Sequence, residues 1–354
     1  MDELPKLTQY SRGAGCGCKI SPQILDELLK STITFSADNK LLVGNSTKDD
    51  AAVYDIGNGM AIISTTDFFM PVADDPFDFG RIAAANSISD VYAMGGKPLM
   101  AIAVLGWPVE KLSPSIAAKV LDGGRTICKE AGIMLAGGHS IDSAEPIFGL
   151  AVTGIVSIAN LKRNNSAKAG DHLLLTKPLG VGILSTAQKR ELLNPEHLRP
   201  MISQMTALNK IGEELGNIKG VNAMTDITGF GLLGHLIEMC DGSGTGADLF
   251  YNQLHLSPGV KEYIAKRIFP DATTRNWSNY SKQVSFEKGV NVMEAFSLLP
   301  DPQTNGGLLI SVTDEALPEV IALFKKETLD QFISPVGRMT EEREKTVKVV
   351  LSLD

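Results

Sequence analysis

The chain has 354 residues, of which 44% are hydrophobic and 21% are charged, a balance typical of a globular protein with a sizeable core. At roughly 150 residues per domain, this length predicts two domains. The formal net charge of −8 argues against a nucleic-acid partner, but it is compatible with a nucleotide, because magnesium bridges carboxylates to phosphates.

Cysteine usage and hydropathy indicate the compartment. Four cysteines in a chain of this length fit a reducing environment better than a disulfide scaffold. The first 30 residues lack the continuous apolar stretch of a signal peptide, and no run reaches the roughly 18 apolar residues of a membrane span. We therefore expect a cytoplasmic protein without a membrane partner.

The first half of the chain predicts a mixture of strands and helices. Three glycines within residues 13–17 favour a flexible loop, and Gly57-Asn58-Gly59 between two apolar runs predicts a hairpin. The further elements expected here are helices over 21–30, 78–94 and 113–131 and strands over 100–105 and 147–156.

The second half repeats this mixture after a polar stretch at 157–170, which we interpret as the domain boundary. A single helix is expected over 196–215, and residues 270–290 are expected to form a long irregular loop. The other expected elements are strands over 171–177, 223–225, 308–312 and 347–353, a turn over 178–182, and helices from 231 and over 315–327. The predicted organisation is thus a segment 1–50, a domain 51–157 and a second domain 170–354.

Familiar nucleotide-binding and zinc motifs are absent. The alternating glycines of the first loop do not form G-x-G-x-x-G, because Cys18 follows Gly17. Gly95-Gly96-Lys97 precedes Pro98 and is therefore not a P-loop. There is no H-E-x-x-H and no paired C-x-x-C pattern. An ATP-binding protein with this sequence must use a different phosphate cradle.

The segment Gly15-Cys16-Gly17-Cys18-Lys19 is the first candidate for chemistry. The reactive form of cysteine is the thiolate, and Lys19 is close enough in sequence to lower the pKa of a thiol. The alternative is a pair of ordinary thiols in a mobile tail, although cysteine is usually buried and packs poorly in a glycine loop. A disulfide between Cys16 and Cys18 is a weaker alternative, because so short a loop strains the bridge.

Five aspartates form the second candidate: Asp49, Asp50, Asp67, Asp90 and Asp226. Magnesium prefers hard oxygen ligands and commonly bridges carboxylates to phosphates. Asp90 lies on an otherwise small and apolar helix, four residues after Asn86 and on the same face. Asp226 ends a strand just before a helix begins, where free N–H groups face phosphate. For any single aspartate, a cap or turn role is the simpler alternative.

Three further segments contain candidate ligand-binding residues. Ala136-Gly-Gly-His-Ser140 predicts a tight turn near a ligand, where His139 donates to phosphate or serves as acid or base, with a structural histidine as the equal alternative. The loop 301–307 precedes a buried strand and has the same two interpretations. Lys177 at a strand end could meet a phosphate, although its spacing alone favours a solvated lysine.

Several of these segments together resemble the selenophosphate synthetases. Residues 7–19, with Arg12-Gly-Ala-Gly-Cys-Gly-Cys-Lys19, resemble the amino-terminal motif of that family, and this motif is the specific one. The other matching segments are 49–54, 64–69, 86–98, 136–140, 225–235 and 301–307. The glycine and aspartate motifs are also similar to those of the wider aminoimidazole ribonucleotide synthetase superfamily.

The resemblance implies an α+β protein with two domains: an amino-terminal α+β domain that forms a dimeric β-barrel-like interface, and a carboxy-terminal α/β layered domain. It implies a homodimer that converts ATP, selenide and water to selenophosphate, AMP and orthophosphate. Cys16 matches the essential cysteine or selenocysteine, and Lys19 matches a lysine that contacts ATP. By motif, the magnesium ligands are Asp50, Asp90 and Asp226, and the nucleotide contacts are Thr47, Lys48, Asp49, Asp67, Asp90, Gly138, His139 and Ser140. A potassium ion is also expected.

Arg12 departs from the resemblance, because close relatives have His there. Arginine holds phosphate but is no acid or base at neutral pH. Two other functions stay open at this stage. One is another enzyme of the same superfamily with a substrate that carries an amide oxygen, for which a soft thiol has no obvious use. The other is a non-catalytic module that binds metal or selenium through Cys16 and Cys18, which leaves the separated aspartates unexplained.

Overall fold

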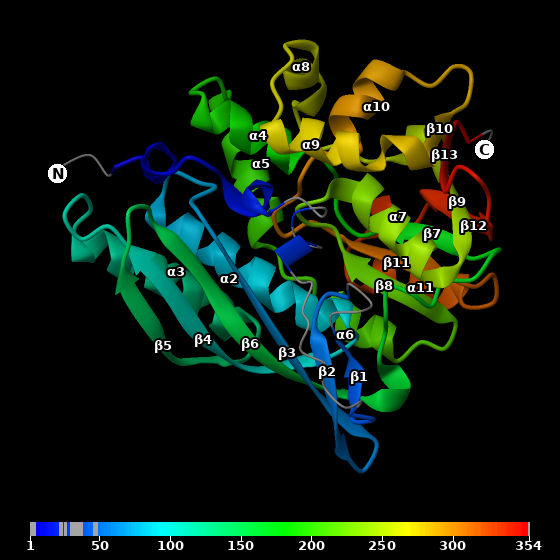
Figure 1. Cartoon of the computed structure of the whole chain (residues 1–354), viewed down its shortest axis with the longest axis horizontal. Coiled ribbons are helices and arrows are strands. Elements are labelled where there is room, and N and C mark those ends of the chain that lie inside the picture. Colours follow the sequence, from blue (N-terminus) through cyan, green and yellow to red (C-terminus); the bar gives the residue numbers. More distant parts are fainter. Residues whose placement is uncertain (1–4, 21–23, 25–26, 29–37, 45–48, 353–354) are drawn as a thin grey trace.

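The computed structural model describes residues 5–20, 24, 27, 28, 38–44 and 49–352. The chain forms two halves, each built on one mixed sheet (Figure 1). The helix expected over 21–30 lies largely outside the described residues. The first half contains β1 (Leu41–Val43), β2 (Ala52–Gly57), β3 (Met60–Phe69), α2 (Pro76–Ala93), β4 (Lys97–Trp107), α3 (Pro114–Glu130), β5 (Met134–Asp142) and β6 (Ile147–Ser157).

The second half follows a short turn at Ile158–Asn160. Its helices are α4 (Val181–Lys189), α5 (Pro195–Thr206), α6 (Ile211–Gly216), α7 (Gly231–Ser243), α8 (Val260–Ala265), α9 (Asp271–Tyr280), α10 (Val292–Leu298) and α11 (Leu317–Lys326). Its strands are β7 (His172–Leu175), β8 (Val221–Asp226), β9 (Thr245–Phe250), β10 (Val284–Phe286), β11 (Leu308–Val312), β12 (Gly337–Glu341) and β13 (Val347–Val350).

The sheet of the first half has the order β1-β2-β3-β6-β4-β5. The predicted hairpin is confirmed, since β2 and β3 pair antiparallel. β3 and β6 pair along their whole length, from Met60 opposite Ser157 to Phe69 opposite Phe148. Only the last pair, β4 with β5, is parallel, and it leaves β5 at the edge of this sheet.

Helix α2 lies between the first sheet and the second half. It packs on β3 and β6 and also contacts α5, α6 and β8. Nearly all of its residues are buried, including the polar Asn86, Ser87 and Ser89. A helix that is buried on every side needs small and apolar residues all round, which explains its run of alanines. The polar groups that remain on it must therefore find partners in the interior.

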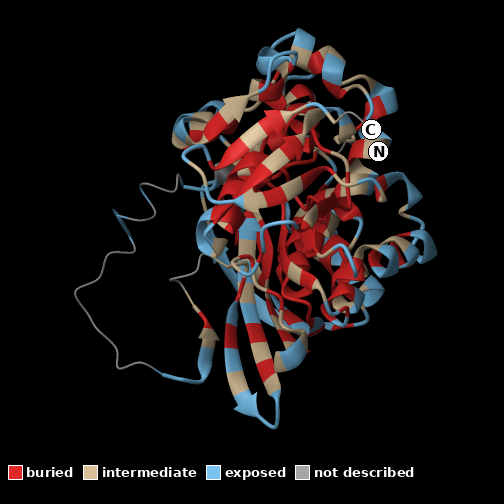
Figure 2. Cartoon of the chain, turned by 90° about the vertical axis from the view of Figure 1, so that its right-hand side faces the viewer, coloured by how far each residue is buried: buried red, intermediate tan, exposed pale blue. Residues whose placement is uncertain are grey.

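The sheet of the second half has the order β10-β13-β9-β12-β7-β11-β8. Its strand β8 lies at the edge that α2 contacts, so Asp226 at the end of β8 faces the first half. Buried side chains from both halves belong to one hydrophobic cluster, which includes Ile63 and Phe148 from the first sheet and Leu173 and Leu249 from the second. Figure 2 shows that buried residues run through both halves of the chain. The two halves therefore share a continuous core.

Two predictions about the second half are wrong. The single helix expected over 196–215 is divided into α5 and α6, because Asn209 between them donates its side-chain amide to Ser89 and to the carbonyl of Gly306. The irregular loop expected over 270–290 instead contains α9 and β10. The ring of Trp277 on α9 packs against Phe286 and Phe296, and this aromatic contact orders the segment.

None of the helices in the described ranges is long and apolar enough to cross a lipid bilayer.

Candidate active site

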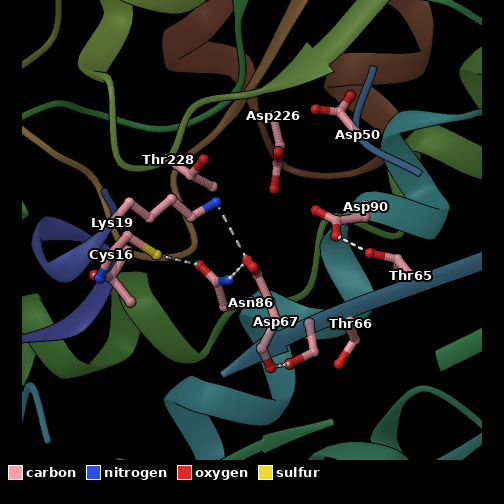
Figure 3. A network of polar contacts seen from close by, with 12 residues as sticks. Cys16, Lys19, Asp50, Thr65, Thr66, Asp67, Asn86, Asp90, Asp226 and Thr228 are labelled. Atoms are coloured by element: carbon pink, nitrogen blue, oxygen red, sulfur yellow. Dashed lines mark hydrogen bonds and ion pairs between the residues drawn. The ribbon is translucent and has the colours of Figure 1, made fainter. Parts of the chain in front are cut away.

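Four aspartates from separate elements meet in one space between the two halves (Figure 3). Asp67 lies near the end of β3, and Asp90 lies one turn before the end of α2. Asp226 is the last residue of β8, and Asp50 comes just before β2. Their side chains point toward one another although their positions in the sequence are far apart. The fold therefore brings four of the five predicted aspartates together.

Hydroxyl groups hold three of these carboxylates. Asp50 accepts a hydrogen bond from Thr225 at 2.9 Å, and Asp90 accepts one from Thr65 at 2.5 Å. Asp226 accepts from Ser89 on α2. Among the described residues, the Oδ2 atoms of Asp50 and Asp226 are buried and have no hydrogen-bond partner. Such buried acceptors indicate a place for a cation or a donor that the chain itself does not supply.

Burial and mutual repulsion oppose ionisation of this cluster. Burial raises the pKa of Asp50 and of Asp90 well above the ordinary value, and the neighbouring aspartates raise both further. Burial likewise raises the pKa of Asp226 to about 6. A bound cation would offset these costs and return the carboxylates to the charged form.

Buried carboxylate oxygens without a partner are hard ligands of the kind that magnesium prefers. The described residues contain no group of three or more candidate ligands already gathered at metal-binding distance. Magnesium does not require such a group, since it is usually bound through one or two carboxylates together with phosphate oxygens and water.

The amino-terminal tail, residues 5–20, also reaches the space around the aspartates. The turn Gly15–Cys18 is a short 3₁₀ helix, so the prediction of a loop without regular structure is wrong. Its order comes from distant partners, because the N–H of Cys16 donates to Thr304 at 3.1 Å. Gly15 has a positive φ of 51°, and a Cβ there would lie 2.4 Å from the hydroxyl of Thr304. Only glycine fits this backbone position.

Asn86 joins the tail to the aspartates. Its side-chain oxygen accepts from the backbone N–H of Asn305 at 2.7 Å and from the thiol of Cys16 at 3.2 Å. Its side-chain nitrogen donates to Asp67 at 2.7 Å. The backbone N–H fixes which end of the amide is the oxygen, since that group only donates. The thiol therefore donates its hydrogen to Asn86 and lies in the same network as Asp67.

Lys19 faces the carboxylates. Its ammonium lies 3.6 Å from Asp67, and its side chain is partly exposed. Burial tends to lower the pKa of Lys19, but the neighbouring carboxylates, Asp67 first and then Asp90 and Asp226, outweigh this effect and raise it. Lys19 is therefore a permanent positive charge at the edge of the aspartate cluster.

Lys19 acts on the Cys16 thiol in the expected direction, but burial of the sulfur has the larger effect in this conformation. Cys16 is 1% exposed, and its burial raises the pKa of the thiol well above the ordinary range. Lys19 lowers the pKa, but burial outweighs it and Asp67 opposes it. The sulfur of Cys16 is a free thiol in this structure. The thiolate forms only when the tail moves or a ligand changes the local charge.

Other predicted site residues lie elsewhere. Asp49 accepts from the N–H of Asn164 at 3.0 Å, and burial raises its pKa to about 6. Thr47 and Lys48 lie outside the described residues. The turn expected at 136–140 is wrong, because Gly138, His139 and Ser140 belong to the exposed edge strand β5. A Cβ on Gly138 would lie 2.3 Å from the carbonyl oxygen of Ala103, so this glycine serves close strand pairing.

The distance between β5 and the aspartates follows from strand register. Asp67 lies opposite Leu150, Leu150 lies opposite Ala103, and Ala103 lies opposite Gly138. Three strand spacings of about 4.8 Å amount to roughly 14 Å. Gly138, His139 and Ser140 are therefore not brought to the aspartate cluster within one chain.

Lys177 and His235 have structural surroundings. Lys177 is buried rather than solvated, and its ammonium donates to the carbonyls of Ala207 and Asn305 at 2.7 and 2.9 Å. Burial lowers its pKa to about 7. His235 accepts from the N–H of Thr228 at 3.1 Å, and burial lowers its pKa to about 3, so it is neutral.

Sequence reasoning missed the residues that hold the site together, chiefly Thr65, Thr225, Thr304 and Asn305. Each contacts a site residue from a distant part of the chain. Thr304 and Asn305 lie in the loop 301–307, which the sequence indicates as a candidate ligand-binding segment without marking these two residues. No local pattern marks Thr65 or Thr225 as more than strand residues.

The fold and the site define a two-domain protein of the AIR synthase related class. The AIR synthase related N-terminal domain matches residues 48–156, and the corresponding C-terminal domain matches residues 168–350. Solved structures with this fold include a thiamine-monophosphate kinase from Stenotrophomonas maltophilia K279a (TM-score 0.64, 18% identity, 88% of this chain and 91% of that chain). The hydrogenase maturation protein HypE in complex with ATP is similar (TM-score 0.64, 18% identity, 88% and 86%).

Relatives with much higher sequence identity show which family within this class the chain belongs to. Selenide, water dikinase of Photorhabdus laumondii is 57% identical over 338 residues, which is 96% of each chain. The protein of the same name from Yersinia pseudotuberculosis is 55% identical over 348 residues, or 98% of each chain. The one from Salmonella typhimurium is 56% identical over 342 residues, or 97% of each. The chain belongs to the selenide, water dikinase family and is a kinase-type enzyme. The family resemblance seen in the sequence is confirmed.

Proposed function

We propose that this chain catalyses the ATP-dependent synthesis of selenophosphate from selenide and water, with release of AMP and orthophosphate. The observation that carries the proposal is the meeting of one thiol, one permanent cation and four carboxylates in a single space (Figure 3). The name shared by the relatives supplies the substrate, and the site supplies groups suited to phosphate and to selenium.

Magnesium is part of the proposal, with Asp50, Asp90 and Asp226 as its ligands. Bound there, it would neutralise phosphate charge, which is most of what phosphoryl transfer requires. The support is the pair of buried, unpartnered oxygens on Asp50 and Asp226 and the raised pKa of each carboxyl. A potassium ion, which the family resemblance implies, remains in the proposal as a second cation.

Lys19 and the tail would act on the nucleotide directly. A lysine ammonium close to Asp67 stabilises negative charge on a transferring phosphoryl group once a nucleotide is bound. The tail covers the aspartates and so excludes water from the reacting atoms. Asp67, Asp49 and the segment that contains Thr47 and Lys48 would contact the nucleotide.

The proposed reaction consists of two successive displacements at phosphorus. Selenide attacks the γ-phosphorus of ATP, so a selenium–phosphorus bond forms while the bond from that phosphorus to the bridging oxygen breaks and ADP leaves. Water then cleaves ADP to AMP and orthophosphate before the site opens. The acceptors are thus selenide for the first phosphoryl group and water for the second.

Cys16 is the proposed catalytic thiol. Its sulfur orients the incoming selenide by contact and forms no bond to selenium, because a sulfur–selenium bond would require a two-electron oxidant that neither ATP nor selenide supplies. In the conformation described here the thiol is protonated and held by Asn86, so the resting site presents the sulfur in a fixed place. Movement of the tail would expose this sulfur and favour the thiolate.

A homodimer is the proposed assembly. The outer face of the first sheet exposes apolar side chains, among them Phe68 (53%), Met100 (47%) and Ile102 (46%). Exposed apolar groups that gather on one sheet face are typical of an interface. We include Gly138, His139 and Ser140 as nucleotide contacts supplied across this interface, because β5 lies at the free edge of the sheet and away from its own aspartates.

The product identifies the reaction. With ATP, magnesium and selenide, phosphorus NMR is expected to show a new resonance with selenium satellites, and chromatography is expected to show AMP. If the chain converts formylglycinamidine ribonucleotide instead and leaves selenide unchanged, another AIR synthase related activity replaces the proposal. If selenium binds without any turnover of ATP, the non-catalytic alternative replaces it.

A further inference from the structure

A basic cavity lies behind the tail, on the side away from the aspartates. Its volume is about 600 Å³, and four of its lining residues are cationic: Arg12 on the tail, Lys189 and Arg190 at the end of α4, and Arg275 on α9. Asp271 is its only carboxylate-bearing lining residue among those described. In a chain of net charge −8, this local excess of positive charge is a built feature and not the average surface.

The cavity is bounded by the tail itself. Lys189 donates to the carbonyls of Ser11 and Gly13 at 2.6 and 2.8 Å. Arg275 donates to the carbonyl of Gly17 at 2.8 Å. The tail residues that line the cavity include Gly13, Ala14 and Gly17, which have no side chain beyond a methyl group. The wall between the cavity and Cys16 is therefore thin backbone held by two cations.

A second, much smaller cavity continues from this wall toward the thiol. It is lined by Cys16, Lys19 and Gly229 and has a volume of about 10 Å³. The two cavities share Gly17, Ala272 and Arg275. In this conformation the second cavity is too narrow for more than a single water. A small shift of Gly17 and Arg275 would join the basic cavity to the sulfur.

The charges on the two sides of the tail differ in sign. Hydrogen selenide is acidic enough to be a monoanion at neutral pH. On the aspartate side, an anion meets Asp67, Asp90 and Asp226, with the cation Lys19 at their edge, and later the phosphates of ATP. On the opposite side, it meets the four cations, one of which, Arg12, lies 3.9 Å from the carboxylate of Glu145. Coulomb attraction and repulsion therefore both favour approach from the basic cavity.

We infer that this basic cavity is where the selenide anion is collected and from which it passes Arg275 to Cys16, while ATP occupies the aspartate side. The inference rests on the proposed function and adds separate routes for the two substrates. It also gives Arg12 a purpose, because an arginine cannot act as an acid or base but contributes charge to an anion site.

Arg190→Glu tests this inference. The tail is held by Lys189 and Arg275, so Arg190 offers a change of charge that leaves those hydrogen bonds in place. We expect kcat/KM for selenide to fall roughly threefold to tenfold, with the loss reduced at high salt. The value of kcat at saturating selenide and KM for ATP should not change. Lys325→Glu on α11, an exposed site in a different part of the fold, makes the same charge change and should leave all constants unaltered.

A second readout does not depend on turnover. Iodoacetate is an anion and iodoacetamide is neutral, so the ratio of their rates at Cys16, located by tandem mass spectrometry, reports the charge along the approach. We expect this ratio to fall in Arg190→Glu and to stay constant in Lys325→Glu. An unchanged ratio, or an equal loss of kcat/KM in both variants, overturns the inference. If the wild-type chain makes no AMP with selenide, the proposed function fails, and the alkylation ratio still decides the charge of the cavity.

Discussion

The sulfur of Cys16 and the side-chain oxygen of Asn86 lie 3.2 Å apart, although 70 residues separate them in the chain. The same Asn86 amide donates to Asp67, and α2, which carries Asn86, also carries Asp90. The thiol on the tail and the carboxylates of the proposed metal site are thus parts of one hydrogen-bonded network. The tail and the carboxylates are linked through this buried amide and also through the ion pair of Lys19 with Asp67.

Replacement of Cys16 by Ser should reduce selenophosphate formation to background. Serine is smaller than cysteine and does not ionise near neutral pH, so it can keep the hydrogen bond to Asn86 but cannot supply the sulfur that contacts selenide. Product formation is measured by phosphorus NMR with ATP and selenide. Cys128→Ser is the matched control, since Cys128 is a free and buried thiol on α3, outside the site. An unchanged rate in Cys16→Ser would remove the sulfur from the mechanism.

Replacement of Asn86 by Ala should release the tail. The change leaves the buried N–H of Asn305 without its acceptor, at a cost of about 1–3 kcal/mol. We expect cleavage by trypsin after Arg12 or Lys19 to become roughly tenfold faster, because the tail opens more often. Asn160→Ala removes an exposed amide pair with Asn217 and serves as the control. Equal cleavage rates in the wild type and Asn86→Ala would mean that Asn86 does not hold the tail.

The pKa of Asp226 predicts a pH effect on stability. Its pKa is raised from 3.8 to about 6 in the folded chain, so the folded state keeps a proton that the unfolded state loses between about pH 4 and pH 6. The contribution of Asp226 to the free energy of unfolding is therefore present at low pH and is lost as the pH rises through 6. Relative to Asp226→Asn, the wild-type chain should lose on the order of 2 kcal/mol between pH 4.5 and pH 7.5.

Urea unfolding of both chains without nucleotide measures this difference. Magnesium with ATP should stabilise the wild type at pH 7.5 and should lose most of this effect in Asp226→Asn, because the amide is a poorer metal ligand. Asp122→Asn, on the exposed surface of α3, is the control for loss of one negative charge. If the free energy of unfolding changes with pH in the same way in the wild type and in Asp226→Asn, the pKa of Asp226 is not raised in the folded chain.

The exposed face of the first sheet predicts the oligomeric state. Sedimentation velocity at micromolar concentration should give a dimer for the wild type and a monomer for Ile102→Asp, because a charge on the apolar face cannot be desolvated in an interface. Met293→Asp changes an even more exposed apolar residue on α10 and should remain a dimer. A monomeric wild type, or a dimeric Ile102→Asp, contradicts this assignment of the interface.

Much of this architecture could be predicted because it depends on local sequence patterns. The turn glycines between two apolar runs predict the β2–β3 hairpin, and the alanine-rich run that ends at Gly95 predicts α2. Asp226 was expected at the junction of a strand and a helix, and that is where it lies. These features depend on neighbouring residues, so single-sequence reasoning reaches them.

The remaining features depend on contacts between distant residues. The pattern of Gly137-Gly138 is typical of a turn, yet pairing with β4 makes it a strand. The proximity of Lys19 suggested a reactive thiolate, whereas burial against α2 keeps the thiol protonated. The hydrogen bonds of Asn209 and the aromatic contacts of Trp277 determine where helices end and begin. No local pattern reveals these tertiary partners.

The nucleotide product formed in the presence of selenide tests the central claim most directly. With magnesium and ATP, the wild-type chain should release one AMP and one orthophosphate for each selenophosphate, and Asp50→Asn should abolish all three products together. Release of ADP as the end product, or AMP formation that does not require selenide, would contradict the account.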